Sequence, residues 1–136
     1  RAVVENTVAL CRTTHADPRC LASCVVVATC VGRLLQGRDR AGDAGGDADP
    51  LYRGVLAPAI AQAESVLRAA GQSLPDEDFL RHVGARDLPE LALDDVHRIG
   101  YTYKCLGAAV WALRSEGGFR AALNAVVQQG GDADTN

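Results

Sequence analysis

The chain has 136 residues, enough for one domain, and its 48% hydrophobic and 23% charged residues are typical of a globular protein. A net charge of −3, with no block of Lys or Arg, argues against nucleic acid and against an anionic membrane surface as partners. The uncharged run from Leu21 to Val31 is well short of the about 20 residues that a membrane-spanning helix needs, so we expect a buried segment there.

The first two predicted helices are separated by a short junction. The first ends near Thr14, and the second runs from Pro18 to about Gln36. Asp17 is a good N-cap and Pro18 is favoured at the first helical position, so both residues mark the start of the second helix. Its middle is apolar almost all round, which is typical of a helix surrounded by other helices.

A polar Gly/Asp segment, residues 37–50, follows the second helix and contains no large apolar residue. We predict a flexible loop there. The third predicted helix contains Leu56, Ile60 and Leu67 on one face and ends at Gly71. Pro58 lies near its start or kinks it.

Three further helices complete the prediction, and no β-hairpin signal interrupts them. The fourth runs from Pro75 to about Ala85, and the irregular stretch 86–95 follows it. Gly117 and Gly118 separate the fifth helix from the sixth. The apolar residues that define these helices are Phe79, Leu80 and Val83 in the fourth, Leu106, Ala109, Val110 and Leu113 in the fifth, and Phe119, Leu123, Val126 and Val127 in the sixth.

The five cysteines lie mostly inside these apolar stretches. Cys20 and Cys24 are one helical turn apart, but no C-x-x-C pair and no His at ligand spacing accompany them, so free thiols are favoured over a zinc site. Free thiols of this kind pack as small hydrophobic groups and indicate a cytoplasmic protein. The chain has no Met and begins at Arg1 inside a helical pattern, so we expect a piece of a longer protein.

The sixth helix leads into Gly130-Gly131-Asp132-Ala133-Asp134-Thr135. Two carboxylates and a hydroxyl on such a turn are hard oxygen ligands, which select Mg²⁺, Ca²⁺ or Mn²⁺ over Zn²⁺. They are too few for Mg²⁺, so water, substrate or other protein groups must supply the rest. Residues 45–49 repeat the first five letters inside the polar loop, where we interpret them as solvated chain. The alternative for Asp132 and Asp134 is a solvated turn that binds no metal.

Two further residues, His15 and Tyr101, have two interpretations each. His15 lies at the junction of the first two helices, where it bonds to the backbone or donates to a phosphate or ribose oxygen. Tyr101 precedes the fifth helix, where it packs or stacks on a base. We expect Trp111 in the core, and we assign no role to His82 or His97.

Taken together, three segments resemble the ADP-ribosylglycohydrolase family. They are Thr14-His15-x-Asp17-Pro18, then Ile99 to Leu106 running into Ala108 to Leu113, and finally Phe119-x-x-Ala122-Leu123 leading to Gly130 to Asn136. The resemblance covers nearly the whole chain except the Gly/Asp loop. It corresponds to the C-terminal half of a family domain, so residues 1–136 are expected to form a partial domain.

The resemblance implies a fold and a metal centre. The fold is all-α, a compact helical bundle around two metal ions, usually Mg²⁺, with Mn²⁺ as the alternative. Asp132, Asp134 and Thr135 are then metal ligands.

It also implies a substrate site, a cleft that binds ADP-ribose. His15 and Tyr101 line this cleft, near the phosphate or ribose and the adenine, and Gly130 and Gly131 belong to the substrate-binding turn. The implied partner is the ADP-ribose moiety of a modified protein or small molecule.

The implied activity is hydrolysis of the bond at the anomeric carbon of the ribose, which releases ADP-ribose. The family's first half supplies further metal ligands and the acidic residue that assists the attacking water, and this chain contains neither. We therefore expect the general base outside the chain, in the missing N-terminal half, and we expect the chain alone to be inactive. The alternatives are a non-catalytic ADP-ribose-binding or structural homologue, and a helical interaction domain whose tail binds cations by accident.

Overall fold

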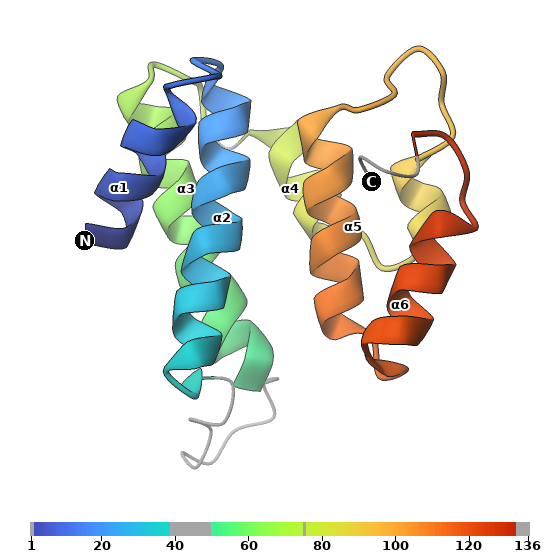
Figure 1. Cartoon of the computed structure of the whole chain (residues 1–136). Helices are drawn as coiled ribbons and strands as arrows, with labels where there is room; N and C mark the ends of the chain where they lie inside the picture. The colour runs from blue at the N-terminus through green and yellow to red at the C-terminus, as the bar shows by residue number, and fades with distance from the viewer. Residues whose placement is uncertain (1, 39–49, 75, 133–136) are drawn as a thin grey trace. The chain divides into compact units, whose positions relative to one another are not determined.

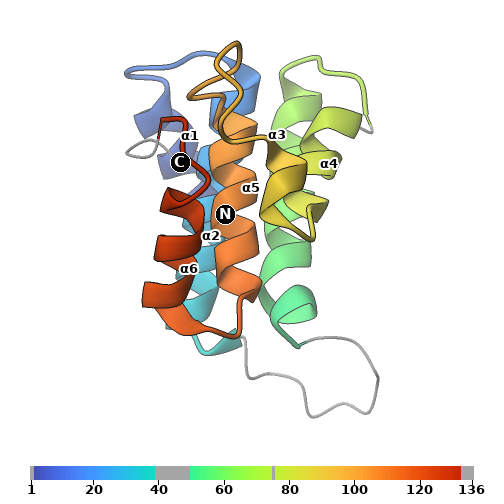
Figure 2. The same ribbon diagram turned by 90° about the vertical axis from the view of Figure 1, so that its right-hand side faces the viewer.

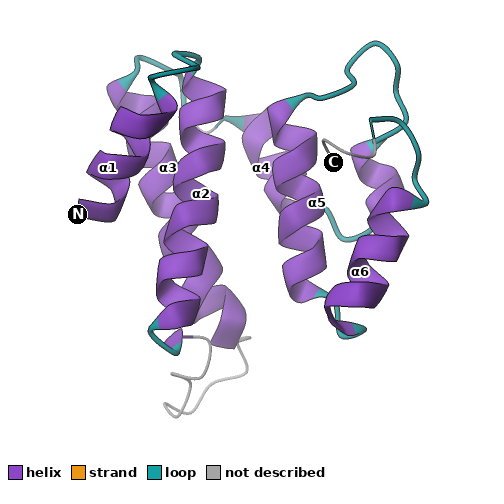
Figure 3. Ribbon diagram, viewed as in Figure 1, coloured by secondary structure: helices purple, strands orange, loops and turns teal. Residues whose placement is uncertain are grey.

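The computed structural model describes residues 2–38, 50–74 and 76–132. These residues form helices and loops without a strand (Figure 3), which confirms the all-α prediction. Contacts divide the chain into two compact units, Arg1–Asp76 and Glu77–Asn136. The organisation of residues 1–136 as one partial domain remains a prediction.

The first unit is built around α2 (Pro18–Leu35), which contacts α1 (Ala2–Cys11), the π-helical turn η2 (Tyr52–Leu56) and α3 (Ala57–Ala69) (Figure 1). α1 has no buried residue, so it covers α2 only partly. The buried apolar residues of this unit are Leu21, Ala22, Val25, Val26, Cys30, Val55, Leu56, Ala59, Ala63 and Leu67.

The start of α2 is as predicted. Asp17 is the extended N-cap residue, and its carboxylate accepts a hydrogen bond from the backbone N–H of Arg19 at 2.8 Å. The Arg19 guanidinium also donates to this carboxylate at 2.6 Å. The side-chain and backbone hydrogen bonds from Arg19 lower the pKa of Asp17 to about 2. The helix ends before Gly37, whose φ of +66° suits glycine.

Among the described residues, α2 is the one helix long and apolar enough to cross a membrane, by length and composition only. Its 18 residues have a mean hydropathy of 1.5, and 39% of them are buried. The uncharged run considered above is shorter than α2, which also contains Arg19 and Arg33 outside that run. The core helix of a soluble protein meets the same criterion, so the absence of a membrane partner stays a prediction.

The third helix begins earlier than predicted, because helical backbone starts at Pro50 and continues through η2 into α3. Pro58 has no N–H, so the carbonyl of Gly54 loses its usual helical donor. The N–H of Ala57 donates to the carbonyl of Tyr52, five residues back, and Arg33 Nε of α2 donates to the Gly54 carbonyl. The π-helical turn therefore carries the helix past the proline.

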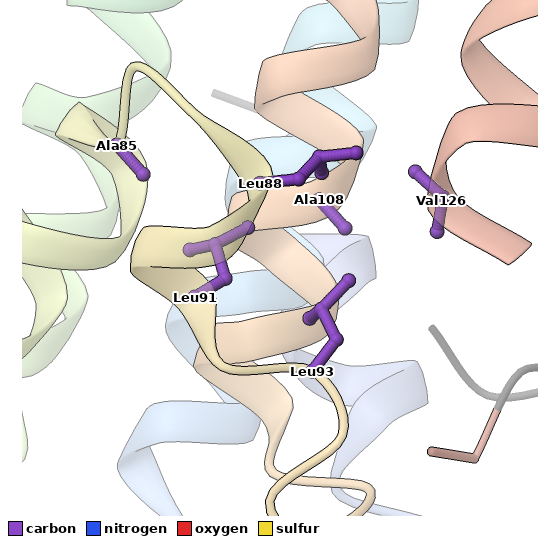
Figure 4. Close-up of a cluster of buried hydrophobic side chains, with 6 residues drawn as sticks. All are labelled: Ala85, Leu88, Leu91, Leu93, Ala108 and Val126. Carbon is purple, nitrogen blue, oxygen red and sulfur yellow. The ribbon is translucent and has the colours of Figure 1, made fainter. Parts of the chain in front are cut away.

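The second unit contains α4 (Glu77–Gly84), the 3₁₀ helix η3 (Leu88–Leu91), α5 (Thr102–Arg114) and α6 (Gly118–Val127). α5 contacts α4, η3 and α6, and lies between α4 and α6 in both views (Figures 1 and 2). One cluster of buried side chains joins η3, α5, α6 and the segment that follows α4 (Figure 4), with Trp111 partly buried against it. Its members are Ala85, Leu88, Leu91, Leu93, Ala108 and Val126.

Two predictions about the buried faces are wrong. On α4, Leu80 is exposed and His82 is buried in its place, beside Phe79 and Val83. On α5, Ala109 is exposed, although Leu106 and Val110 are buried as predicted.

The predicted apolar face of α6 is mostly uncovered. Val126 is buried, but Phe119 is 83% exposed, and Leu123 and Val127 are exposed as well. Phe119, Leu123 and Val126, together with residues of α5, line an open apolar groove of about 660 Å³. Helical periodicity thus identified an apolar face, but it did not show which part of that face is covered.

The cysteines are free, as predicted, but they are not uniformly buried. Cys30 alone is buried, and burial raises the pKa of its thiol. Cys24 is exposed, and the other three are half-buried, so packing as a small hydrophobic group describes Cys30 well and Cys24 not at all.

Candidate functional site

The turn after α6 depends on two glycines with positive φ, Gly130 at +75° and Gly131 at +73°. A Cβ at Gly131 would lie 2.2 Å from the carbonyl oxygen of Leu93 and 3.1 Å from the Cα of Asp94. A Cβ at Gly130 would meet nothing within 4 Å. The chain therefore passes directly over the Leu93–Asp94 backbone at Gly131, and this close approach fixes the direction in which Asp132 leaves the turn.

Asp132 is half-buried near the beginning of α5. Burial is the largest cause that raises the pKa of the Cys105 thiol, and the negative charge of Asp132 raises that pKa further. Cys105 lies in the first turn of α5, and its Sγ donates to the Tyr101 carbonyl at 3.6 Å. α5 and α6 run antiparallel, so the chain after α6 returns to the N-terminal end of α5 (Figure 1).

The backbone under Gly131 is itself held by a buried lysine. Lys104 is 4% exposed, and its Nζ donates to the Ala92 carbonyl at 2.6 Å and to Asp95 Oδ2 at 3.5 Å. Ala92 has left-handed backbone, with φ of 46°, which strains a residue other than glycine. The Lys104 ammonium thus stabilises the turn that contains Leu93. Sequence analysis missed this role, although a charged residue in the apolar pattern of a helix was its signal.

Of the three predicted metal ligands the structure describes only Asp132, since Asp134 and Thr135 lie outside the described residues. Within residues 2–38, 50–74 and 76–132, no group of three or more His, Cys, Asp or Glu side chains could hold a metal ion. The Asp132 carboxylate is the kind of donor that Mg²⁺ prefers, but one ligand does not make a site. The metal centre therefore remains a prediction.

Tyr101 directly precedes α5 and is half-buried. Its hydroxyl donates to Asp78 Oδ2 of α4 at 2.6 Å. Its ring lies edge-on to His82, with centroids 5.7 Å apart, and to Tyr103, at 5.5 Å. The Arg98 guanidinium lies 5.9 Å from the ring centroid. Tyr101 is thus part of an aromatic and charged cluster.

His82 also belongs to this cluster, although no role was expected for it. The imidazole is 1% exposed, and its Nδ1 lies 2.7 Å from the Asp78 carbonyl oxygen, which places the N–H on Nδ1. Burial is the main cause that lowers the pKa of His82, which favours the neutral ring. The other histidine without a predicted role, His97, is exposed.

Asp78 connects the charged members of the cluster. Its Oδ1 accepts a hydrogen bond from Arg81 Nη2 at 2.7 Å and lies 3.4 Å from His82 Nδ1. Burial is the largest single influence on its pKa and raises it, but the hydrogen bonds from Tyr101 and Arg81 and the nearby positive charges outweigh burial, so the pKa of Asp78 is lowered. Asp78 therefore stays ionised at neutral pH.

His15 lies in the first unit, in the turn between α1 and α2. The side chain is exposed, and its Nδ1 is 2.9 Å from Thr14 Oγ1. Its backbone N–H donates to the Cys11 carbonyl at 2.8 Å. The ring contacts a neighbouring hydroxyl rather than the backbone, and its predicted place beside ADP-ribose is untested.

Comparison with known proteins decides the family. The family model described as ADP-ribosylglycohydrolase matches residues 1–136, the whole chain. The chain belongs to the ADP-ribosylglycohydrolase family. No curated protein and no solved structure matches it. Membership makes the complete protein a hydrolase of the ADP-ribosyl glycohydrolase type.

The predicted site residues of this family member belong to different units. Those in the second unit are Tyr101, Gly130, Gly131 and Asp132. Tyr101 and Asp132 lie near the same end of α5, the helix N-terminus, where backbone N–H groups favour anions. His15 belongs to the first unit.

Proposed function

We propose that the complete protein is a Mg²⁺-dependent hydrolase that releases ADP-ribose from a modified protein or small molecule. The observation that carries the proposal is the packing of Gly131 on the Leu93 backbone, which brings Asp132 to the N-terminal end of α5. Asp132 is the first acidic residue of the segment from Gly130 to Thr135, called the acidic turn below. The same end of α5 carries Tyr101, so Asp132, proposed for the metal, and Tyr101, proposed for the substrate, belong to one part of the second unit.

Asp132, Asp134 and Thr135 would hold the metal, for which Mg²⁺ is proposed and Mn²⁺ is the alternative. A carboxylate, a second carboxylate and a hydroxyl match the preference of Mg²⁺ for hard oxygen. When bound, the ion would supply Lewis-acid polarisation and orientation of ribose and water oxygens. The turn's own contribution is rigidity, because Gly131 allows it to rest on backbone that Lys104 secures.

Tyr101 and His15 are proposed to contact ADP-ribose. The half-buried Tyr101 ring offers a surface on which a base can stack, and the Arg98 guanidinium near that ring is a suitable partner for the diphosphate. The His15 ring is exposed and can donate to a phosphate or ribose oxygen. The general base lies outside residues 1–136 in this proposal.

The proposal is tested by measuring ADP-ribose release by the full-length protein, with Mg²⁺ and with a chelator. The substrates are arginine-linked and serine-linked ADP-ribosylated peptides and a small-molecule ADP-ribose ester. We expect turnover of at least one substrate with Mg²⁺, loss of turnover with chelator, and no turnover by the 136-residue chain alone. Binding of ADP-ribose without its release from any of the substrates would favour the non-catalytic homologue instead. Turnover that resists chelation would contradict the metal requirement.

A further inference from the structure

The Asp78 carboxylate links the beginning of α4 to the residue before α5. Tyr101 Oη donates to Asp78 Oδ2 at 2.6 Å, although the two residues are 23 positions apart in the sequence. A phenol has one O–H donor, and this carboxylate uses it. A hydrogen bond to an ionised acceptor is among the stronger ones in proteins, so it restrains the orientation of the Tyr101 ring.

Two other aromatic rings pack against Tyr101. The interplanar angle is 76° with His82 and 62° with Tyr103, both edge-to-face arrangements. Tyr103 is fully buried and packs against Phe79, with centroids 5.5 Å apart. The Tyr101 side chain is thus held by the buried rings of His82 and Tyr103 and by a carboxylate at its hydroxyl.

Asp78 is also fixed. Arg81 Nη2 donates to its Oδ1 at 2.7 Å, and the buried His82 imidazole donates to its backbone carbonyl at 2.7 Å. The Arg81 side chain is largely exposed, so solvent screens this ion pair and the Tyr101 bond is the stronger constraint. Both oxygens of the carboxylate are engaged on described partners.

We propose that Asp78 is a positioning residue, which holds the Tyr101 hydroxyl so that Tyr101 meets the adenine base of ADP-ribose with its ring and not with its hydroxyl. This inference rests on the function proposed above. A side chain already fixed in its binding orientation loses little conformational freedom when ligand binds, so the carboxylate increases affinity without touching the ligand. Sequence analysis assigned Asp78 no role, because nothing in the sequence pairs it with Tyr101.

A double-mutant cycle on the full-length protein tests the coupling. ADP-ribose affinity is measured by calorimetry for wild type, Asp78→Asn, Tyr101→Phe and the double variant. Tyr101→Phe removes this bond, and Asp78→Asn replaces its charged acceptor with a weaker neutral one, while both keep the ring. We therefore expect each to weaken binding about 3- to 10-fold and the double variant to be no weaker than Tyr101→Phe alone. Glu77→Gln is the matched control, because it removes one exposed charge from the same helical turn, and it should leave affinity unchanged.

A second readout does not depend on ADP-ribose. In protein labelled with ¹³C at tyrosine Cζ, the Tyr101→Phe variant identifies the Tyr101 resonance. We expect Asp78→Asn to shift that resonance and Glu77→Gln to leave it in place, with helical circular dichroism unchanged in both.

The outcomes separate this inference from the proposed function. Multiplicative losses in the cycle, or a Tyr101 resonance that ignores Asp78→Asn, would overturn the positioning role. Wild-type protein that fails to bind ADP-ribose would overturn the ligand and the proposed function together, while the resonance shift would still decide whether Asp78 holds the hydroxyl.

Discussion

At the scale of single residues, the two glycines before Asp132 differ in what a side chain would meet. Both have positive φ, so Ala strains the backbone at either position. Only at Gly131 would its Cβ collide with backbone, 2.2 Å from the Leu93 carbonyl oxygen. We predict that Gly131→Ala displaces the acidic turn and reduces Mg²⁺-dependent ADP-ribose release about 100-fold, the scale of a 1 Å misplacement.

Gly130→Ala is the matched control, since it adds the same backbone strain without the collision. It should retain most of the activity in the same assay. Equal losses in the two variants would show that the close packing at Gly131 does not position the turn.

The buried imidazole of His82 makes stability depend on pH. Burial lowers the pKa of His82 in the folded protein below 6.5, its ordinary value, so the unfolded chain takes up the proton first as the pH falls. The stability that neutral His82 contributes is complete above about pH 6.5 and is lost as the pH falls toward the folded pKa. We predict that the free energy of unfolding decreases between about pH 7 and pH 5, a window above the range where Asp78 titrates.

Urea unfolding followed by circular dichroism measures this dependence. His82→Gln keeps a donor for the Asp78 carbonyl but cannot titrate, so its stability should change less over the same window. His97→Gln, at an exposed position, should follow wild type. A His82→Gln protein with the full wild-type slope would assign the pH dependence to another group.

At the scale of helices, α5 approaches its neighbours most closely at Gly107. A Cβ there would lie 2.9 Å from the His82 carbonyl oxygen and 2.6 Å from Leu91 Cδ2. The leucine end can move, but the backbone carbonyl is less free to do so. We predict that Gly107→Ala lowers the free energy of unfolding by about 1–3 kcal/mol, as overpacking does.

Gly32 in α2 offers the contrast, because a Cβ there would meet nothing within 4 Å. Gly32→Ala should raise the free energy of unfolding by about 0.5–1 kcal/mol, since Ala favours helix and restricts the unfolded chain. Denaturant titrations of both variants provide the measurement. If Gly107→Ala were also stabilising, α5 would not be closely packed against α4 and η3.

Much of the helical architecture was predictable from local signals. The Asp17 N-cap with Pro18 set the start of α2, and the glycines at 37, 71 and 118 mark helix boundaries as expected. These signals act within a few residues, so a sequence displays them directly. The early start of the third helix escaped prediction because Arg33, from another helix, bonds the carbonyl that Pro58 leaves free.

The candidate site was less predictable, since its contacts join distant positions. Tyr101 and Asp132 carried recognisable patterns, but the Asp78 carboxylate that holds Tyr101 lies 23 residues away. Lys104 supports the Leu93 turn through a backbone carbonyl, a contact that no residue pattern encodes. Leu80 is exposed and His82 is buried, because helical period cannot decide which edge of an apolar face is covered.

At the scale of the whole molecule, the family match covers residues 1–136, whereas the described part of the candidate site is concentrated in the second unit. That unit alone brings Tyr101 and the start of the acidic turn to one end of α5. The first unit contributes His15, whose role in ADP-ribose binding is part of the proposal. The proposed function therefore depends most on whether the acidic turn binds the catalytic metal.

The most direct measurement is Mg²⁺-dependent ADP-ribose release by full-length protein carrying Asp134→Asn, which removes one proposed ligand charge and keeps the side-chain shape. Asp49→Asn is the matched control, because residues 45–49 repeat the sequence of residues 130–134. Loss of a direct ligand should exceed the 10- to 100-fold effect typical of groups that only support ligands. We predict a decrease of more than about 100-fold for Asp134→Asn with unchanged circular dichroism, and wild-type activity for Asp49→Asn; activity that survives Asp134→Asn would contradict the account.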